Sequence, residues 1–113
     1  MSKPLRGEVW TVDLDPTRGH EQAGKRPALV VSADTFNAGP AGLVIVLPMT
    51  SKGRGVRSHV PGEPPEGGLR TRSFVKCEDI RSVAVERLGR RLGRVSPATM
   101  EAVALRLRVL MEL

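Results

Sequence analysis

Two short, uninterrupted apolar runs, residues 28–32 and 43–47, constrain the fold of this 113-residue chain more than any other feature. Each run has the length of a strand and lacks polar alternation, which is typical of a central strand covered on both faces. Residues 7–14 alternate instead, with Trp10, Val12 and Leu14 on one face, and this predicts a half-buried strand. We therefore expect Trp10 to lie in the core rather than to stack on a ligand.

Further strands are expected near residues 57–60, at 74–77 and at 81–85, and one short helical turn between 33 and 42. Residues 50–72 are rich in glycine, proline and charge and predict a long mobile connection, while residues 87–94 predict a basic turn region. Ser96 and Pro97 then open a helix as N-cap and first helical residue. We expect its apolar face to cover the sheet; that face comprises Met100, Val103, Ala104, Leu107, Leu110 and Met111.

Several strands followed by one helix, without alternating strand–helix units, predict a single α+β domain over residues 1–113, built as a small barrel. One cysteine, Cys77, cannot form an internal disulfide, which fits a reducing cytosol. Neither a signal peptide nor an apolar stretch of membrane-spanning length is visible. We therefore expect a cytoplasmic protein that does not associate with a membrane.

The charge balance points to a polyanionic partner. The chain carries 18 basic and 12 acidic residues, a net charge of +6 and a pI near 10.7, and nucleic acid is the leading candidate for such a surface. Aromatic side chains are scarce, with one tryptophan, two phenylalanines and no tyrosine. We therefore expect an RNA ligand to be held by charge and hydrogen bonds rather than by base stacking.

The loop expected at residues 19–27 (GHEQAGKRP) has the highest density of proton-transfer and anion-binding side chains in the chain. Strands on either side fix the ends of such a loop while its polar groups stay accessible. His20 or Glu21 could act as a general base, and Arg26 could hold a phosphate and balance its growing charge. Thr50 and Ser51 follow an apolar strand, where they could donate to a phosphate oxygen or simply end the strand.

Other classes of site have weaker support. Two separated histidines, His20 and His59, and one cysteine do not make a zinc site. Asp13 and Asp15 share a strand face, as the acids of a magnesium site would, but acids at a strand end are usually solvated. Phosphate-loop and Gly-x-Ser-x-Gly motifs are missing, so nucleotide and ester hydrolysis lack support. Metal-free RNA cleavage fits, because the 2′-hydroxyl of RNA is itself the nucleophile.

Taken together, the motifs closely resemble the MazF/PemK/Kid family of bacterial toxins. The similar segments are RGEVW at 6–10, DPT at 15–17, GHEQAG at 19–24, RP at 26–27, PMTS at 48–51 and VKCE at 75–78. The resemblance implies a homodimeric, SH3-like β-barrel that cuts single-stranded RNA at short sequences without a metal ion or cofactor. It also implies a cognate antitoxin, whose acidic segment we expect to be disordered when free.

The resemblance implies roles for individual residues. Arg26 and Thr50 match the arginine and threonine that are central to cleavage, and Glu21 matches a loop glutamate. His20, Lys76 and Glu78 match a histidine, an arginine and an aspartate of the Kid branch, although lysine cannot reproduce a guanidinium fork. The candidate catalytic residues are Arg26, Thr50, His20 and Glu21, with His20 favoured for proton transfer and Glu21 for orienting Arg26; the candidate RNA-binding residues are Gln22, Ser51, Lys52, Arg54, Lys76 and Glu78.

Lys76 and Glu78 lie two apart on an expected strand, so they share a face where they could contact RNA or pair with each other. Two alternatives to an RNA-cleaving toxin remain open. One is a nucleic-acid-binding barrel without catalysis, and the other is a gyrase-directed toxin of the same fold. A gyrase-directed toxin acts through protein contacts and would not need Arg26 or Thr50.

Overall fold

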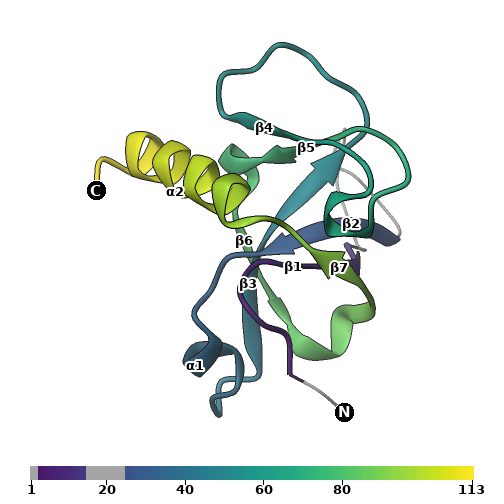
Figure 1. Ribbon diagram of the computed structural model, residues 1–113. Helices are drawn as coiled ribbons and strands as arrows, with labels where there is room; N and C mark the ends of the chain where they lie inside the picture. The colour runs from purple at the N-terminus through teal and green to yellow at the C-terminus, as the bar shows by residue number, and fades with distance from the viewer. Residues whose placement is uncertain (1–2, 15–24) are drawn as a thin grey trace.

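The computed structural model describes residues 3–14 and 25–113. Figure 1 shows a strongly twisted sheet from which the C-terminal helix extends past β4 and β5. The described residues form seven strands and two α-helices. The strands are β1 (Glu8–Asp13), β2 (Lys25–Val30), β3 (Leu43–Thr50), β4 (His59–Gly62), β5 (Ser73–Lys76), β6 (Arg81–Ala84) and β7 (Leu88–Arg94). The helices are α1 (Asp34–Asn37) and α2 (Pro97–Met111), with short 3-10 turns η1 (Glu66–Gly68), η2 (Cys77–Asp79) and η3 (Val85–Arg87).

The sheet is antiparallel and has β3 at its centre. Its strand order is β4-β5-β3-β2-β1-β7, and β6 pairs with the first half of β3. The far end of β3 pairs instead with β5. The predicted α+β class, a barrel-like twisted antiparallel sheet with a C-terminal helix, is confirmed. Among the described residues the barrel does not close, since β4 and β7 remain the two ends of the strand order.

Both apolar runs lie between two hydrophobic clusters. The first cluster includes Val9, Leu29, Leu47, Val75 and Val103, and the second includes Val12, Ala28, Val30, Val46 and Val83. On β2, Leu29 faces the first cluster, whereas Ala28 and Val30 face the second. On β3 the same alternation sends Leu47 to the first cluster and Val46 to the second, and all five side chains are fully buried. The prediction of central strands covered on both faces is confirmed.

Trp10 is partly buried against the second cluster, so its predicted core position is also confirmed. Its indole Nε1 donates to Glu8 at 3.0 Å, which gives the buried ring edge the partner that it needs.

The basic turn predicted at residues 87–94 is wrong, because these residues form β7 and pair with β1. An edge strand is exposed on one side, so it tolerates the arginines that made this segment look like a turn. Arg91 pairs with the buried carboxylate of Glu8 at 2.6 Å. The short strand expected at residues 57–60 lies slightly later, at His59–Gly62, and the short helical turn between 33 and 42 is confirmed as α1.

The C-terminal helix begins as predicted, because the Ser96 side chain accepts a hydrogen bond from the backbone N–H of Thr99 at 3.2 Å. Its apolar face covers the sheet only over its first turns. Val103 is fully buried, but Leu110 and Met111 are 46% and 53% exposed, so the expected cover is wrong for the last turn. No helix in the described ranges is long and apolar enough to cross a membrane.

Candidate functional site

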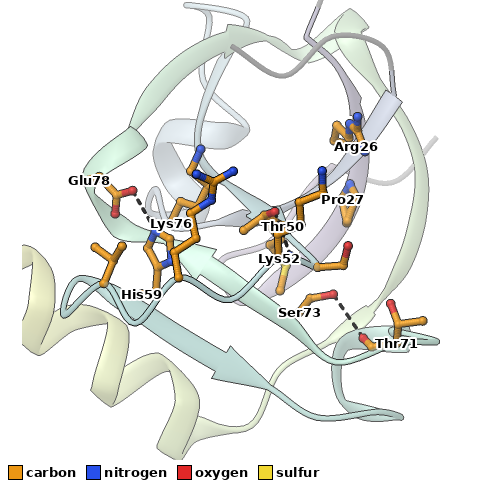
Figure 2. Close-up of a pocket in the computed structure, with 13 residues that line it drawn as sticks. Arg26, Pro27, Thr50, Lys52, His59, Thr71, Ser73, Lys76 and Glu78 are labelled. Carbon is orange, nitrogen blue, oxygen red and sulfur yellow. Dashed lines mark hydrogen bonds and ion pairs between the residues drawn. The ribbon is translucent and has the colours of Figure 1, made fainter. Parts of the chain in front are cut away.

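A groove of about 700 Å³ lies where the ends of β2, β3 and β5 meet the connection that follows β3 (Figure 2). It collects most of the side chains that the sequence singles out. Those that line it are Arg26, Thr50, Ser51, Lys52, Arg54, Lys76 and Glu78. Thr71 and Ser73, which the sequence does not single out, line it too. So does His59, which enters the sequence analysis only as an unsupported zinc ligand.

Strand register accounts for the meeting of Arg26 and Thr50. β2 and β3 are antiparallel, and Ala28 is paired with Pro48. Arg26 lies two residues before Ala28 on β2, and Thr50 lies two residues after Pro48 on β3. The same register therefore brings both residues to one face of the sheet. Arg26 is exposed and Thr50 is half-buried, which leaves a guanidinium and a hydroxyl open to a ligand in the groove.

Lys76 and Glu78 do not share a strand face, so that prediction is wrong. β5 ends at Lys76 and the chain turns through η2, which breaks the two-residue alternation. Nor do the two side chains pair with each other: the Lys76 Nζ lies 3.6 Å from an oxygen of Asp79, while Glu78 turns to β4. Both still line the groove.

Glu78 is held through both of its carboxylate oxygens. The Ser58 hydroxyl donates to Oε1 at 2.5 Å, and His59 Nε2 lies 2.9 Å from Oε2. Burial alone would raise the pKa of Glu78, but these hydrogen bonds outweigh burial and the pKa lies below its usual value. The groove therefore contains a fixed, ionised carboxylate at neutral pH.

His59 is the functional candidate that sequence reasoning missed. The sequence offers it only as a zinc ligand, and its separation from His20 argues against that role. The β4–β5 register pairs His59 with Lys76 and so carries it to the groove. The position of His59 in the groove depends on pairing between strands, and no local sequence pattern around residue 59 predicts it.

The predicted residues His20, Glu21 and Gln22, together with Asp15, lie outside the described residues. Within residues 3–14 and 25–113, no three histidine, cysteine or acidic side chains gather as a metal site would require. Cys77 is buried, and burial, with the nearby Glu78 charge, raises the pKa of its thiol to about 11. This thiol stays protonated at neutral pH and is not a candidate nucleophile.

The electrostatics of the groove suit an anionic polymer. Its lining cations are Arg26, Lys52, Arg54 and Lys76, and its lining carboxylate is Glu78. Lysine and arginine side chains that gather in one groove attract the phosphates of a nucleic-acid backbone. Together with the Thr50 hydroxyl, they can bind a phosphodiester and stabilise negative charge that develops on it.

Comparison with known proteins agrees with the resemblance that the sequence motifs indicate. The sequence model of a family described as PemK-like, MazF-like toxin of type II toxin-antitoxin system matches residues 5–111. The chain is 42% identical over 104 residues to Endoribonuclease PemK of Escherichia coli, covering 90% of this chain and 77% of that protein. It is 44% identical over 100 residues to Endoribonuclease MazF9 of Mycobacterium tuberculosis, covering 84% and 85% of the two chains.

Solved structures show the same likeness. MazF from Deinococcus radiodurans superposes with a TM-score of 0.87 over the full length of both chains, at 28% identity. An endoribonuclease in complex with its cognate antitoxin, from a mycobacterial species, superposes with a TM-score of 0.81 at 29% identity. That match covers 97% of this chain and 96% of the other.

Proposed function

The chain belongs to the PemK-like, MazF-like family of type II toxins and is an endoribonuclease, and we propose that it cuts single-stranded messenger RNA at a short sequence without a metal ion. The observation that carries this proposal is the register of β2 and β3, which brings Arg26 and Thr50 to one face of a basic groove. A toxin directed at gyrase acts through protein contacts and would not need this juxtaposition.

The chemistry follows from what the groove offers. The scissile phosphate lies against the Arg26 guanidinium and the Thr50 hydroxyl, which stabilise the charge that grows on its oxygens in the transition state. The 2′-hydroxyl loses its proton and its oxygen bonds to phosphorus, while the bond from phosphorus to the 5′-oxygen breaks. The departing 5′-oxygen takes up a proton. The products are a 2′,3′-cyclic phosphate and a 5′-hydroxyl.

Proton transfer is assigned to the residues that precede β2 in the sequence. His20 is proposed as the proton-transfer group, because histidine is the side chain whose ordinary pKa lies nearest to neutral pH. Glu21 is proposed to orient Arg26, because a carboxylate beside a guanidinium has a lowered pKa and is a poor base. The remaining candidates hold the RNA along the groove: Gln22, Ser51, Lys52, Arg54, Lys76 and Glu78.

Two protein partners belong to the proposal. One is a cognate antitoxin, since a similar endoribonuclease is solved in complex with its cognate antitoxin. An acidic segment of such an antitoxin would neutralise the cations that line this groove.

The other protein partner is a second copy of this chain, docked on the apolar end of α2, where Leu105 and Val109 are 56% and 71% exposed. Because the proposed substrate is messenger RNA, we propose that the protein acts in the cytoplasm.

The test is an incubation of purified protein with a long RNA in the presence of EDTA, followed by mapping of the cut ends. We expect cleavage at a recurring short sequence, with 2′,3′-cyclic phosphate and 5′-hydroxyl ends. A matched substrate that carries one 2′-deoxy sugar at the cleaved position should resist. Intact RNA, or cleavage of the 2′-deoxy substrate at the same rate, would contradict the proposal.

A further inference from the structure

His59 is an unfavourable residue for its position. It is the first residue of β4 and is only 9% exposed, and the next residue, Val60, lies in the core and is 3% exposed. Its Nδ1 atom is buried and has no hydrogen-bond partner among the described residues. A buried polar atom without a partner costs stability, whereas an apolar side chain of similar size would not. Stability alone therefore does not explain a histidine here.

His59 fixes the position of the Glu78 carboxylate through a hydrogen bond. An ionised carboxylate offers only acceptors, so the proton between the two groups resides on His59 Nε2, 2.9 Å from Oε2. The Ser58 hydroxyl holds the other oxygen at 2.5 Å. The Glu78 side chain is nevertheless 38% exposed and lines the groove. Each of its oxygens has a second lone pair, so the carboxylate is fixed but can still accept a hydrogen bond from a ligand.

The position of Glu78 decides which part of an RNA it meets. Figure 2 shows Glu78 and Arg26 on opposite sides of the groove, with Thr50 between them. The cations attract phosphates, whereas a fixed anion repels them. A carboxylate accepts readily from the amino group of a base, as acidic side chains do from the amino group of cytosine. Its lowered pKa makes it a stable acceptor and a poor base for proton transfer.

We propose that His59, together with Ser58, is a positioning residue that fixes Glu78 as the acceptor for a nucleobase bearing an exocyclic amino group, and thereby sets part of the RNA sequence that the groove accepts. This inference rests on the proposed RNA cleavage. It makes Glu78 a specificity-determining residue and leaves the chemistry to other groups. Uracil, which has no exocyclic amino group, is disfavoured at the nucleotide that faces Glu78.

The experiment compares cleavage of a randomised RNA pool by the wild-type protein and by variants at both positions. Glu78→Gln should lower the preference for the amino-bearing base about tenfold or more, in line with the discrimination that one good base contact provides. His59→Leu should lower it in the same way, because the carboxylate is released. His59→Gln should retain it, because the glutamine side-chain N–H can replace Nε2–H. The double variant His59→Leu with Glu78→Gln should show no change beyond that of Glu78→Gln alone.

Controls separate this role from a structural one. Glu86→Gln makes the same charge change at an exposed residue of η3 that does not line the groove, and should leave the sequence preference unchanged. Melting curves should show His59→Leu to be at least as stable as the wild-type protein, because a leucine side chain would bury no unpaired nitrogen. Binding is measured in parallel with short RNAs that carry a 2′-deoxy sugar at the cleaved position and differ only in the base facing Glu78.

Several outcomes would overturn the inference. An unchanged base preference in folded His59→Leu would show that His59 is only structural. Equal loss of cleavage at every sequence in Glu78→Gln, with a changed acidic limb of the pH–rate profile, would make Glu78 a proton-transfer group. If the wild-type protein cuts no RNA, the proposed function fails; the binding arm then still decides whether Glu78 selects an amino-bearing base.

Discussion

The Glu66 carboxylate accepts a 2.7 Å hydrogen bond from the backbone N–H of Ser96, which fastens η1 to the start of α2. The Thr99 hydroxyl donates to the same oxygen at 2.6 Å. These contacts satisfy donors at the helix N-terminus and place a negative charge at its positive end. The connection between β4 and β5 is thereby anchored to the helix at Glu66.

We expect Glu66→Ala to lower the free energy of unfolding by about 1–2 kcal/mol at pH 7, because donors at the helix N-terminus lose a charged acceptor. Burial alone would raise the pKa of Glu66, but hydrogen bonds from Thr99 and Ser96 lower it below its ordinary value of 4.5. A lowered folded-state pKa means that the contribution is complete above pH 4.5 and is lost as the pH falls through the folded-state value. Urea unfolding at about pH 7 and about pH 3 should therefore show a smaller effect of the mutation at the lower pH.

Glu63→Ala is the matched control for this prediction. Glu63 lies in the same connection and pairs with Arg72 at 2.6 Å, but both side chains are more than half exposed. Exposed pairs of this kind contribute little. A loss at Glu66 that is no larger than the loss at Glu63, or that does not depend on pH, would count against the anchor.

A second prediction concerns the close approach of η1 to β7. Gly68 has a φ of +72°, and a Cβ atom there would overlap the carbonyl oxygen of Leu92. Gly68→Ala should therefore cost at least about 3 kcal/mol of unfolding free energy. Gly42 has a similar φ of +67° but open space around it, so Gly42→Ala should cost only about 1–2 kcal/mol from backbone strain. Equal losses in urea melts of the two variants would show that the overlap is relieved.

The contrast between β2 and β7 shows what local pattern can and cannot predict. β2 and β3 contain the two apolar runs, whose burial can be predicted without knowledge of their partner strands, so the central positions of these strands follow from the sequence. β7 carries arginines at an exposed edge, and only its pairing with β1 makes it a strand. Residues 87–94 therefore look like a turn until that long-range pairing is known.

The candidate site likewise contains residues whose positions can be predicted from local sequence and residues whose positions cannot. Arg26 lies shortly before one apolar run and Thr50 shortly after the other, so the motifs and the expected strand ends together predict their positions. Side-chain alternation predicts the wrong face for Glu78, because a 3-10 turn at Cys77–Asp79 interrupts the strand and backbone turns of this kind leave no periodic signal. Its contact with His59 depends on the β4–β5 register, which side-chain alternation alone does not fix.

A third prediction concerns the apolar end of α2, where Leu105 and Val109 form a shallow surface with Arg57 and Ser58. If a second copy docks there, Leu105→Glu or Val109→Glu should convert a dimer into a monomer, because a charge would be buried in the interface. Light scattering at micromolar concentration measures this. Glu101→Gln, at an exposed position of the same helix, is the control and should stay dimeric. A wild-type protein that is monomeric at this concentration would rule the dimer out.

The last prediction concerns Arg26 and Thr50, the two residues proposed to contact the scissile phosphate. Arg26→Ala and Thr50→Ala should each lower the rate of RNA cleavage by roughly a hundred- to a thousandfold, or about 2.7–4 kcal/mol, because each removes one contact to the charge that develops on the phosphate. Both should fold normally, since Arg26 is exposed and Thr50 ends its strand. Single-turnover cleavage of one mapped site at saturating protein separates this loss from weaker RNA binding.

Conservative variants decide which property of each side chain matters. Thr50→Ser keeps the hydroxyl and should restore most of the rate, whereas Arg26→Lys keeps the charge but loses the planar pair of donors and should restore little. Arg70→Ala removes an exposed cation that does not line the groove, and it should cut at the wild-type rate. Near-normal cleavage by Arg26→Ala or Thr50→Ala would remove that residue from the catalytic set, and a full rescue by Arg26→Lys would reduce the role of Arg26 to simple charge.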